Sequence, residues 1–396
     1  MAAQLDAVHQ ADRFAFVPTG GAAQGHEGAE QANRFIERRG ARVEQARRRG
    51  RGAAVNPAGR FEALERHGFD DGWQAFDDLP PFKTDVQVEQ ARTIITKNAS
   101  PDISFDRSVN AYRGCEHGCI YCFARPTHSH MGLSAGLDFE TKLFAKPEAA
   151  KLLRKEIAAK SYVCKPIAMG TNTDPYQPIE KQWRVTREIL ETLEKANHPV
   201  GIVTKSALIT RDIDILSRMA AKGLARVGIS LTTMDRKLSR TMEPRAATPT
   251  LRLETIRKLS DAGIPVTAII APVVPSLTDH EMEKLLDAAK ANGARDAEYI
   301  LLRLPHEVAG LFKDWLLREY PDRYTHVMSL IRSMRDGKDY DAEFGTRLRG
   351  VGPYAWQLGR RFEIATKRLK LVSMRKPLRT DLFEKPVLAG TQLSLF

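Results

Sequence analysis

The sequence predicts an α/β protein whose six β/α units form an open or partial barrel. From Ser108 onward, short β-branched or apolar runs alternate with longer amphipathic segments, and no short internal repeat occurs. This alternation is typical of parallel strands joined by crossover helices. Ligands of such folds bind at the carboxyl ends of the strands, so candidate site residues are expected there. We expect the strands near residues 109–113, 166–170, 200–204, 226–231, 266–271 and 299–304.

The size and charge of the chain set limits on its function. Its 396 residues can bury the core of one large α/β domain with extensions, or of two ordinary domains. The apolar runs are too short to cross a bilayer, and the N-terminus lacks the pattern of a secretory signal, which predicts a cytoplasmic protein without a membrane partner. The formal net charge of +12 favours a polyanionic partner such as nucleic acid, although charge alone does not separate DNA from RNA.

Composition divides the chain into five regions. We expect a disordered, basic N-terminal extension at 1–60, a lead-in segment at 61–107, the β/α core at 108–335, a basic helical C-terminal region at 336–390 and a short tail at 391–396. The extension contains a run of arginines that ends with Arg47, Arg48, Arg49 and Arg51. These arginines either contact phosphates or form a solvated tail.

Three of the four cysteines lie within eight positions, in the loop that follows the first predicted strand. Cys115, Cys119 and Cys122 have the spacing Cys-x3-Cys-x2-Cys, and Gly114 and Gly118 give this loop flexibility. The spacing makes no disulfide framework but suits a metal site in a reducing compartment. Three thiolates can bind three irons of a cubane cluster and leave the fourth iron open for a ligand that the protein does not supply.

A structural zinc site is the alternative for this loop. Zinc would need a fourth ligand, for which His117, His128 or His130 is available. Zinc sites usually pair their cysteines with a second, distant pair, so the spacing favours the cluster.

The cysteine loop resembles the radical SAM signature. Cys115, Cys119, Tyr121 and Cys122 match Cys-x3-Cys-x-aromatic-Cys, and the stretches GTNTDPYQPIE and VTKSALITRDIDIL are similar to the spore photoproduct lyase-like (DNA repair photolyase-like) branch. The resemblance covers about residues 93–305 and is greatest to a bacterial subgroup that shares the segment RGRGAAVNPAGRFE. It implies a partial (β/α)6 TIM-like barrel of the radical SAM type, a [4Fe–4S] cluster and S-adenosyl-L-methionine.

The resemblance also implies a mechanism. The methionyl amino and carboxylate groups of S-adenosylmethionine bind the open iron, and one electron from a reductase or flavodoxin-type donor cleaves the cofactor. The resulting 5′-deoxyadenosyl radical abstracts hydrogen from the substrate, while the protein orients the reactants and excludes water.

Six residues match positions at which this family contacts the cofactor. Tyr121 resembles the adenine-contacting aromatic, although it is equally a candidate for simple packing in the loop. Asn172 and Thr173 follow the second strand and offer acceptors to the amino group. Lys205 follows the third strand and would reach the methionyl carboxylate or ribose, unless it makes a surface ion pair. The positions that would contact ribose and adenine are Ser230 and Ala271.

Other polar residues near these strands have weaker assignments. Glu243 and Arg245 either bind a ligand or pair with each other. Glu140, like Asp138, is expected to be a structural partner of basic groups. Cys164 lies before the second strand and is expected to be a buried structural thiol rather than a hydrogen donor. Phe123 stands where spore photoproduct lyases carry a tyrosine, a departure that bears on the substrate.

The predicted function is that of a lyase-like radical SAM enzyme acting on nucleic acid, with a DNA lesion favoured. The alternatives are modification of RNA or protein, and an iron–sulfur redox protein without S-adenosylmethionine chemistry. The last five residues resemble the peptide by which bacterial DNA-processing enzymes bind the replication sliding clamp, and an apolar terminus packed on its own domain is the alternative. These residues are Gln392, Leu393, Ser394, Leu395 and Phe396.

Overall fold

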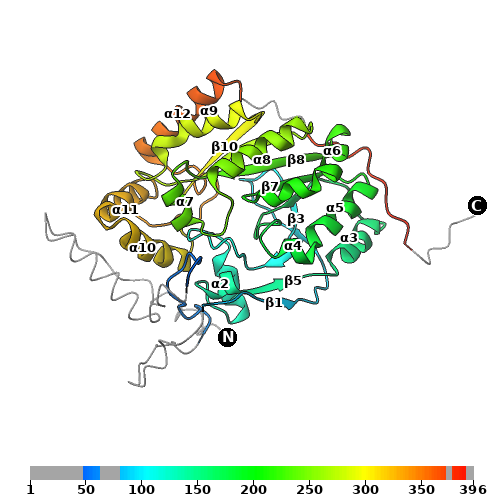
Figure 1. Cartoon of the computed structure of the whole chain (residues 1–396), viewed down its shortest axis with the longest axis horizontal. Coiled ribbons are helices and arrows are strands. Elements are labelled where there is room, and N and C mark those ends of the chain that lie inside the picture. Colours follow the sequence, from blue (N-terminus) through cyan, green and yellow to red (C-terminus); the bar gives the residue numbers. More distant parts are fainter. Residues whose placement is uncertain (1–47, 63–80, 372–376, 389–396) are drawn as a thin grey trace, which may run out of the picture.

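Six parallel strands form the centre of the molecule, and an antiparallel strand extends one edge (Figure 1). The computed structural model describes residues 48–62, 81–371 and 377–388. Neighbours in the sheet follow the chain, in the order β3, β6, β7, β8, β9, β10, and β2 (Ile95–Lys97) pairs with β3. The predicted partial (β/α)6 barrel is therefore confirmed. The parallel strands are β3 Arg107–Val109, β6 Ile167–Met169, β7 Val200–Thr204, β8 Ala225–Leu231, β9 Val266–Val273 and β10 Asp296–Leu301.

Two of the six predicted strands need correction. The first ends at Val109, because the chain then turns and Tyr112–Arg113 (β4) pairs instead with β5 (Lys142–Ala145) in a small second sheet completed by β1 (Asp85–Val88). The last begins at Asp296 rather than near 299 and ends at Leu301. Leu302 and Leu304 are apolar for another reason, since they pack in a second core beneath the C-terminal helices. Because apolar residues continue beyond the end of β10, the sequence pattern placed the last strand too far toward the C-terminus.

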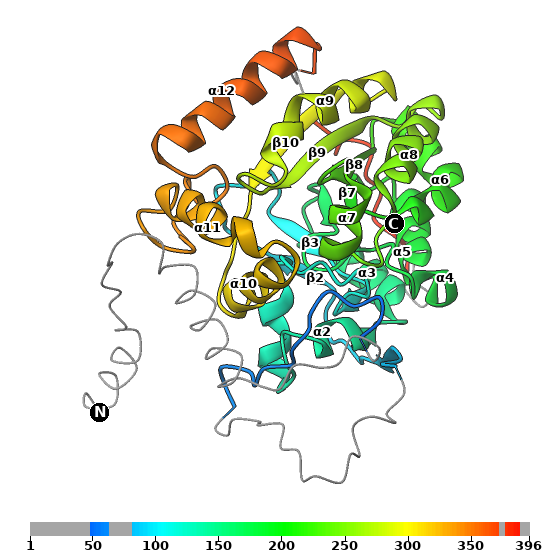
Figure 2. The ribbon, with the colours of Figure 1, turned by 60° about the vertical axis from the view of Figure 1, so that its left-hand side comes forward.

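Helices between the strands cover one side of the sheet (Figures 1 and 2). In α5, buried residues recur at helical spacing, as Val185, Ile189 and Leu193 show, and they pack with strand residues such as Val227 in the main core. None of the helices within the described ranges is long and apolar enough to cross a membrane. The helices of this region are α2 Asp138–Thr141, α3 Ala149–Ala158, α4 Glu180–Trp183, α5 Val185–Lys195, α6 Ile213–Ala221, α7 Arg236–Met242, α8 Pro249–Asp261 and α9 Met282–Ala291, with the 3-10 turns η1 Arg125–Met131, η2 Ala207–Asp212 and η3 Asp279–Glu281.

The C-terminal region contains three described helices and packs closely on the core, and the first two of these helices lie within the range 108–335 expected for the β/α core. Its helices are α10 Glu307–Glu319, α11 Tyr324–Ser333 and α12 Gly352–Arg368, with the turn η4 Pro321–Arg323. Trp315 of α10 is fully buried in the second core, and its indole N–H donates to the carbonyl of Thr241 at 3.1 Å. Since Thr241 lies in α7, this contact ties the C-terminal helices to the carboxyl side of the sheet.

Residues 377–388 cross the opposite, amino-terminal side of the sheet. The Arg379 N–H donates to the Gly223 carbonyl and the Glu384 N–H to the Ala196 carbonyl, each at 3.0 Å. Lys385 Nζ donates to the Lys160 carbonyl at 2.7 Å, and Arg154 holds the Val387 carbonyl at 2.6 Å. The segment is therefore hydrogen-bonded to the core as far as Val387. Residues 1–47 of the N-terminal extension and the tail at 391–396 lie outside the described residues.

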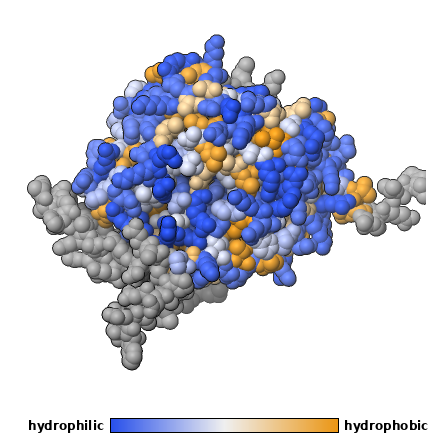
Figure 3. Space-filling model, in the orientation of Figure 1, coloured by the Kyte–Doolittle hydropathy of each residue, from blue (hydrophilic) through white to orange (hydrophobic). Residues whose placement is uncertain are grey.

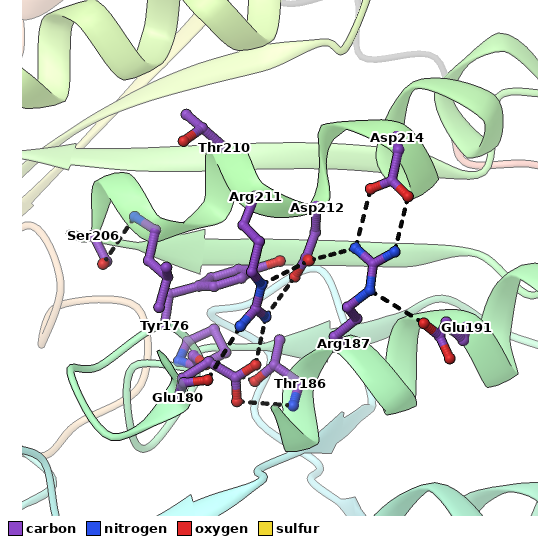
Figure 4. A network of polar contacts seen from close by, with 12 residues as sticks. Tyr176, Glu180, Thr186, Arg187, Glu191, Ser206, Thr210, Arg211, Asp212 and Asp214 are labelled. Carbon is purple, nitrogen blue, oxygen red and sulfur yellow. Dashed lines mark hydrogen bonds and ion pairs between the residues drawn. The ribbon is translucent and has the colours of Figure 1, made fainter. Parts of the chain in front are cut away.

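A buried polar network fixes the helices beside β7 (Figure 4). Glu180 accepts hydrogen bonds from the Thr186 N–H at 3.0 Å and from the Arg211 guanidinium at 2.6 Å. Asp212 in turn accepts from Arg211 and Arg187, each at 2.8 Å. Both carboxylates are fully buried, so each needs these cationic partners to offset the cost of leaving water.

Removing the Glu180 carboxylate should destabilise the protein strongly. The Glu180→Ala variant leaves the Thr186 N–H and the Tyr112 hydroxyl without their acceptor and Arg211 with Asp212 alone, which should lower the free energy of unfolding by about 3 kcal/mol. The matched control is Glu194→Ala, because Glu194 pairs with an arginine, Arg218, whose side chain is mostly exposed. Urea unfolding should show little change for the control. An equal loss in both variants would contradict a special role of the buried network.

Candidate functional site

The three clustered cysteines lie in a loop at the carboxyl edge of the sheet, after β3 and β4. All are free thiols, and Cys115 and Cys119 are only 7% exposed. Burial raises the pKa of each thiol, that of Cys119 to about 12. Gly114 and Gly118 have φ values of +72° and +65°, which side chains disfavour, so glycine lets the loop turn between the cysteines.

A fully buried ion pair between Arg125 and Glu140 supports the cysteine loop. Arg125 donates to the carbonyls of Cys119 at 2.9 Å and Gly118 at 3.1 Å, and to the Glu140 carboxylate at 2.5 Å. Glu140 also accepts the N–H groups of Gly52 and Ala53, each at 2.9 Å. The expected structural role of Glu140 is confirmed. The segment around Gly52 is thereby fastened against the cysteine loop.

Arg51 differs from both expectations for the arginine run, a phosphate-binding segment or a solvated tail, because its side chain is buried. It is only 6% exposed, and it donates to the Glu140 carbonyl at 2.7 Å and to Thr84 Oγ1 at 2.9 Å. It is therefore a structural residue rather than part of a solvated or phosphate-binding tail. Arg49 is exposed, and Arg47 lies outside the described residues.

The donor set fits an iron–sulfur cluster better than a single zinc ion. In the part of the chain that the structure describes, no three His, Cys, Asp or Glu side chains are grouped to bind one metal ion together. The histidines weighed as a fourth zinc ligand have other contacts: His117 with Asp174, His128 with the Lys142 carbonyl at 3.0 Å, and His130 with the ring of Phe61. Three thiols on one loop, two of them buried and one partly exposed, suit a cubane, in which each thiolate binds its own iron.

Tyr121 is joined to the end of β8 through Glu243. The tyrosine hydroxyl donates to the Glu243 carboxylate, which also accepts from Thr232 at 2.7 Å and pairs with Arg252. Burial would raise the Glu243 pKa, but the charges of Arg252 and Lys205 and these hydrogen bonds outweigh burial and lower it to about 2. The expected pairing of Glu243 with Arg245 is wrong, since Arg245 lies instead 3.5 Å from Glu116.

A second buried carboxylate, Asp174, joins the cysteine loop to the end of β7. It contacts His117 Nδ1 at 3.3 Å and accepts from Thr204 Oγ1 at 2.6 Å and the Lys205 N–H at 2.8 Å. Burial would raise its pKa, but His117 and these hydrogen bonds outweigh burial and lower it to about 2. Gln177 adds a second link, because it donates to the Gly114 carbonyl at 3.1 Å and accepts the Glu116 N–H at 2.9 Å.

The structure brings the residues predicted to contact the cofactor to one edge of the sheet. Lys205 Nζ lies 5.8 Å from the ring centroid of Tyr121. The Ser230 hydroxyl donates to the Ala271 carbonyl at 3.0 Å, so these two residues meet where β8 and β9 end. Thr173 donates its hydroxyl to the Tyr112 carbonyl at 3.2 Å, which leaves its oxygen able to accept one more bond. Asn172 is partly exposed nearby.

Sequence reasoning missed the residues that orient this site. Asp174 stands in the quoted stretch TNTD, and its place at a strand end was a usable signal. Gln177 and Arg252 gave no such signal, because nothing local distinguishes them from surface residues. Cys164 is partly exposed, so the expected burial of this thiol is wrong, but it lies before β6 and away from the cysteine loop as its position in the sequence indicated.

Comparisons with known proteins agree with this geometry. Residues 109–289 match the family model of the radical SAM superfamily. The chain is 36% identical over 232 residues to the uncharacterized protein Rv2578c of Mycobacterium tuberculosis, covering 58% of this chain and 68% of that protein. It is 28% identical over 217 residues to the uncharacterized protein MJ0683 of Methanocaldococcus jannaschii, covering 54% of this chain and 77% of that protein.

Solved structures of spore photoproduct lyase have a similar fold. A point mutant of that enzyme and the enzyme complexed with dinucleoside spore photoproduct each give a TM-score of 0.50, at 16% and 17% identity, over 72% of this chain and 79% of theirs. A double mutant with bound AdoMet and the same dinucleoside also gives 0.50, at 16% identity, over 72% of this chain and 78% of that one. The thiol loop, the strand-end residues and these matches lead to one conclusion: the chain belongs to the radical SAM superfamily and is an enzyme of that type, which uses a [4Fe–4S] cluster and S-adenosylmethionine.

Proposed function

We propose that this enzyme acts on nucleic acid, with DNA favoured, by abstracting hydrogen from a lesion or modified nucleotide. The observation that carries the proposal is a group of exposed cations on α7, the helix that follows β8. Arg236, Lys237 and Arg240 are all exposed, and none forms an ion pair with a described residue. We call these three residues the α7 basic rim. Unpaired cations beside a reaction site attract a phosphate backbone and gain affinity by releasing its counterions.

The α7 basic rim flanks the cysteine loop directly. The Ile120 N–H donates to the Met242 carbonyl at 3.0 Å, and the Arg245 N–H donates to the His117 carbonyl at 3.3 Å. The rim thus belongs to a segment that is hydrogen-bonded to the loop on both sides of Cys119. The face shown in Figure 3 is predominantly hydrophilic, with its apolar residues in small groups, in keeping with a polar partner.

The likeness to spore photoproduct lyase supports the proposal at the level of the fold. That enzyme has been solved with a dinucleoside photoproduct, at 17% identity to this chain. Folds carry many functions, so the substrate must be argued from the site. Phe123 in place of a tyrosine favours a lesion other than spore photoproduct for this chain.

The chain's own residues would hold the cofactor and keep water out. When bound and reduced, the cluster with S-adenosylmethionine supplies a 5′-deoxyadenosyl radical for hydrogen abstraction. Cys115, Cys119 and Cys122 would ligate the cluster. Tyr121, held by Glu243, would contact adenine, and Lys205 would face the methionyl carboxylate or ribose. The remaining proposed contacts are Asn172, Thr173, Ser230 and Ala271.

Two protein partners complete the proposal. A reductase or flavodoxin-type protein would donate the electron, and the tail Gln392 to Phe396 would bind the replication sliding clamp. The segment before the tail supports docking away from the substrate, because Arg154 and Lys160 fasten it on the amino-terminal side of the sheet. A clamp bound there would leave the cysteine loop accessible.

Cluster assembly should depend on three of the four cysteines. Anaerobic reconstitution of the full-length protein should give one [4Fe–4S] cluster that, once reduced, converts S-adenosylmethionine to 5′-deoxyadenosine and methionine. Replacing Cys115, Cys119 or Cys122 with Ala should abolish both iron binding and this activity. The control Cys164→Ala should retain both, and cluster loss in that variant would overturn the ligand assignment.

DNA binding should depend on the α7 basic rim. Neutralising Arg236, Lys237 and Arg240 to glutamine should reduce the slope of log affinity against log salt by about 3, one for each lost phosphate contact. The matched control neutralises Lys284, Lys290 and Arg295, which are also exposed but lie on α9 and before the amino end of β10. Equal slopes in the two triple variants would show that DNA binds elsewhere.

Clamp binding should depend on the tail alone. Deleting residues 392–396 should abolish binding to the sliding clamp of the same species, because Leu395 and Phe396 would fill its apolar pocket. Surface plasmon resonance can measure the binding, and S-adenosylmethionine cleavage should be unaffected. A full-length protein without affinity for the clamp would remove this partner from the proposal.

A further inference from the structure

We propose that Phe123, Arg303 and Tyr340 form a nucleotide-binding platform at the mouth of the barrel. In this platform the Arg303 guanidinium binds a backbone phosphate of the substrate strand, and the Phe123 ring stacks on the neighbouring base. The inference rests on the proposed nucleic-acid substrate and identifies the residues that would recognise it. It is independent of the α7 basic rim, since none of the three residues lies on that helix.

Phe123 places an aromatic surface next to the reaction site. It directly follows the cluster ligand Cys122, yet 48% of its surface is exposed. A half-exposed phenylalanine lacks part of the free energy that burial of its ring would give. Aromatic faces that remain open beside a reaction site are suited to stacking on a base, which requires no particular sequence.

Arg303 is a cation without an anionic partner. It follows β10, and its guanidinium carbon lies 5.3 Å from the ring centroid of Phe123 and 5.9 Å from that of Tyr340. No described carboxylate lies within ion-pair distance of it; Asp102 is near enough to feel its charge but pairs directly with Arg347. Its Nε is buried and lacks a hydrogen-bond partner among the described residues. Two flanking rings therefore hold the cation in position while it has no direct ion pair with a described residue.

The C-terminal region fixes the second ring of the platform. Tyr340 Oη accepts a hydrogen bond from Arg303 at 3.2 Å. The preceding residue, Asp339, pairs with Lys313 of α10 and with Arg332 of α11 at 2.9 Å. These two ion pairs connect the platform to α10 and α11. The position of Tyr340 therefore does not depend only on the loop that contains it.

A buried arginine, Arg335, joins the loop that contains Tyr340 to the residues that follow β10. Arg335 donates to the Leu302 carbonyl at 3.2 Å and to the Thr346 carbonyl at 3.0 Å. Leu302 directly precedes Arg303, so this contact sets the direction in which the strand end leaves the sheet. The C-terminal region thereby supplies one wall of the mouth, which explains why it packs on the carboxyl side of the core.

The chemistry of the platform fits a nucleotide unit. A guanidinium binds phosphate oxygens through parallel N–H donors, and its planar faces can stay stacked on aromatic rings while it does so. A phosphate and a base are adjacent in every nucleotide, as Arg303 and Phe123 are in the platform. Lys205, 5.8 Å from the ring centroid of Tyr121, is the cation proposed for the carboxylate of S-adenosylmethionine, which leaves Arg303 for the substrate.

The test compares three variants of the anaerobically reconstituted full-length protein. Arg303→Gln removes the proposed phosphate contact and Phe123→Leu removes the stacking face. Arg349→Gln is the matched control, because the Arg349 guanidinium also stacks on a ring, 3.9 Å from the centroid of Tyr299, but lies in the segment that precedes α12. Iron content and melting temperature identify variants that fold as the wild type does. The probes are a fluorescently labelled single-stranded DNA and the same strand with abasic sites, followed by anisotropy.

The variants Arg303→Gln and Phe123→Leu should both weaken DNA binding but should differ in its salt dependence and in how they respond to abasic sites. Arg303→Gln should bind the intact strand about ten-fold more weakly and lower the salt slope by about one. Phe123→Leu should also bind the intact strand about ten-fold more weakly, should keep the wild-type slope, and should no longer distinguish the intact from the abasic strand. Arg349→Gln should match the wild type with both probes.

Two negative results have separate meanings. If the wild type binds DNA and both platform variants match Arg349→Gln, the platform is wrong while the proposed function stands. If the wild type binds neither strand at any salt concentration, the proposed function fails and the platform fails with it. Should Arg303 prove unsuitable for substitution by glutamine, Arg303→Lys tests the same point, because lysine keeps the charge but loses the planar donors and the stacking. It should weaken binding while keeping the salt slope, and wild-type affinity would count against the platform.

Discussion

The site depends on the buried ion pair between Arg125 and Glu140. A guanidinium has five N–H donors, and those of Arg125 reach the carbonyls of Gly118 and Cys119 as well as the Glu140 carboxylate. These are the backbone groups that give the cysteine loop its shape. Removing either charge would leave the other buried without a partner, so the pair favours a single loop conformation. The same carboxylate binds the backbone of Gly52, which makes a segment far away in sequence part of the cluster site.

Two further carboxylates connect this loop to the barrel. Asp174 joins His117 to the end of β7, and Glu243 joins Tyr121 to the end of β8. Both have a pKa of about 2, because cations and hydrogen-bond donors outweigh burial, so both carry a negative charge at neutral pH. Each strand end therefore positions one side of the loop. Radical chemistry needs such fixed positions, since the protein contributes orientation and exclusion of water rather than the reactive group.

The sequence predicted the features that local patterns encode. Alternating apolar and amphipathic segments located four of the six parallel strands closely and misplaced the first and the last, and cysteine spacing located the cluster loop. Contacts between distant segments could not be predicted in this way. Arg51 belongs to a run of charges in the sequence but is buried against Glu140, and Glu243 pairs with Arg252 rather than with the nearer Arg245. The platform joins residues from the cluster loop, a strand end and the C-terminal region, so no local pattern could reveal it.

The central claim is that the thiol loop leaves one iron of the cluster to S-adenosylmethionine. Electron–nuclear double resonance tests it most directly, on the reduced full-length protein with S-adenosylmethionine labelled at the methionyl nitrogen and the carboxylate oxygen. Three protein thiolates leave room for this ligand, so both labels are expected to couple to the cluster. A fully loaded cluster that shows neither coupling, or that shows coupling to a histidine nitrogen of the protein in their place, would contradict the claim.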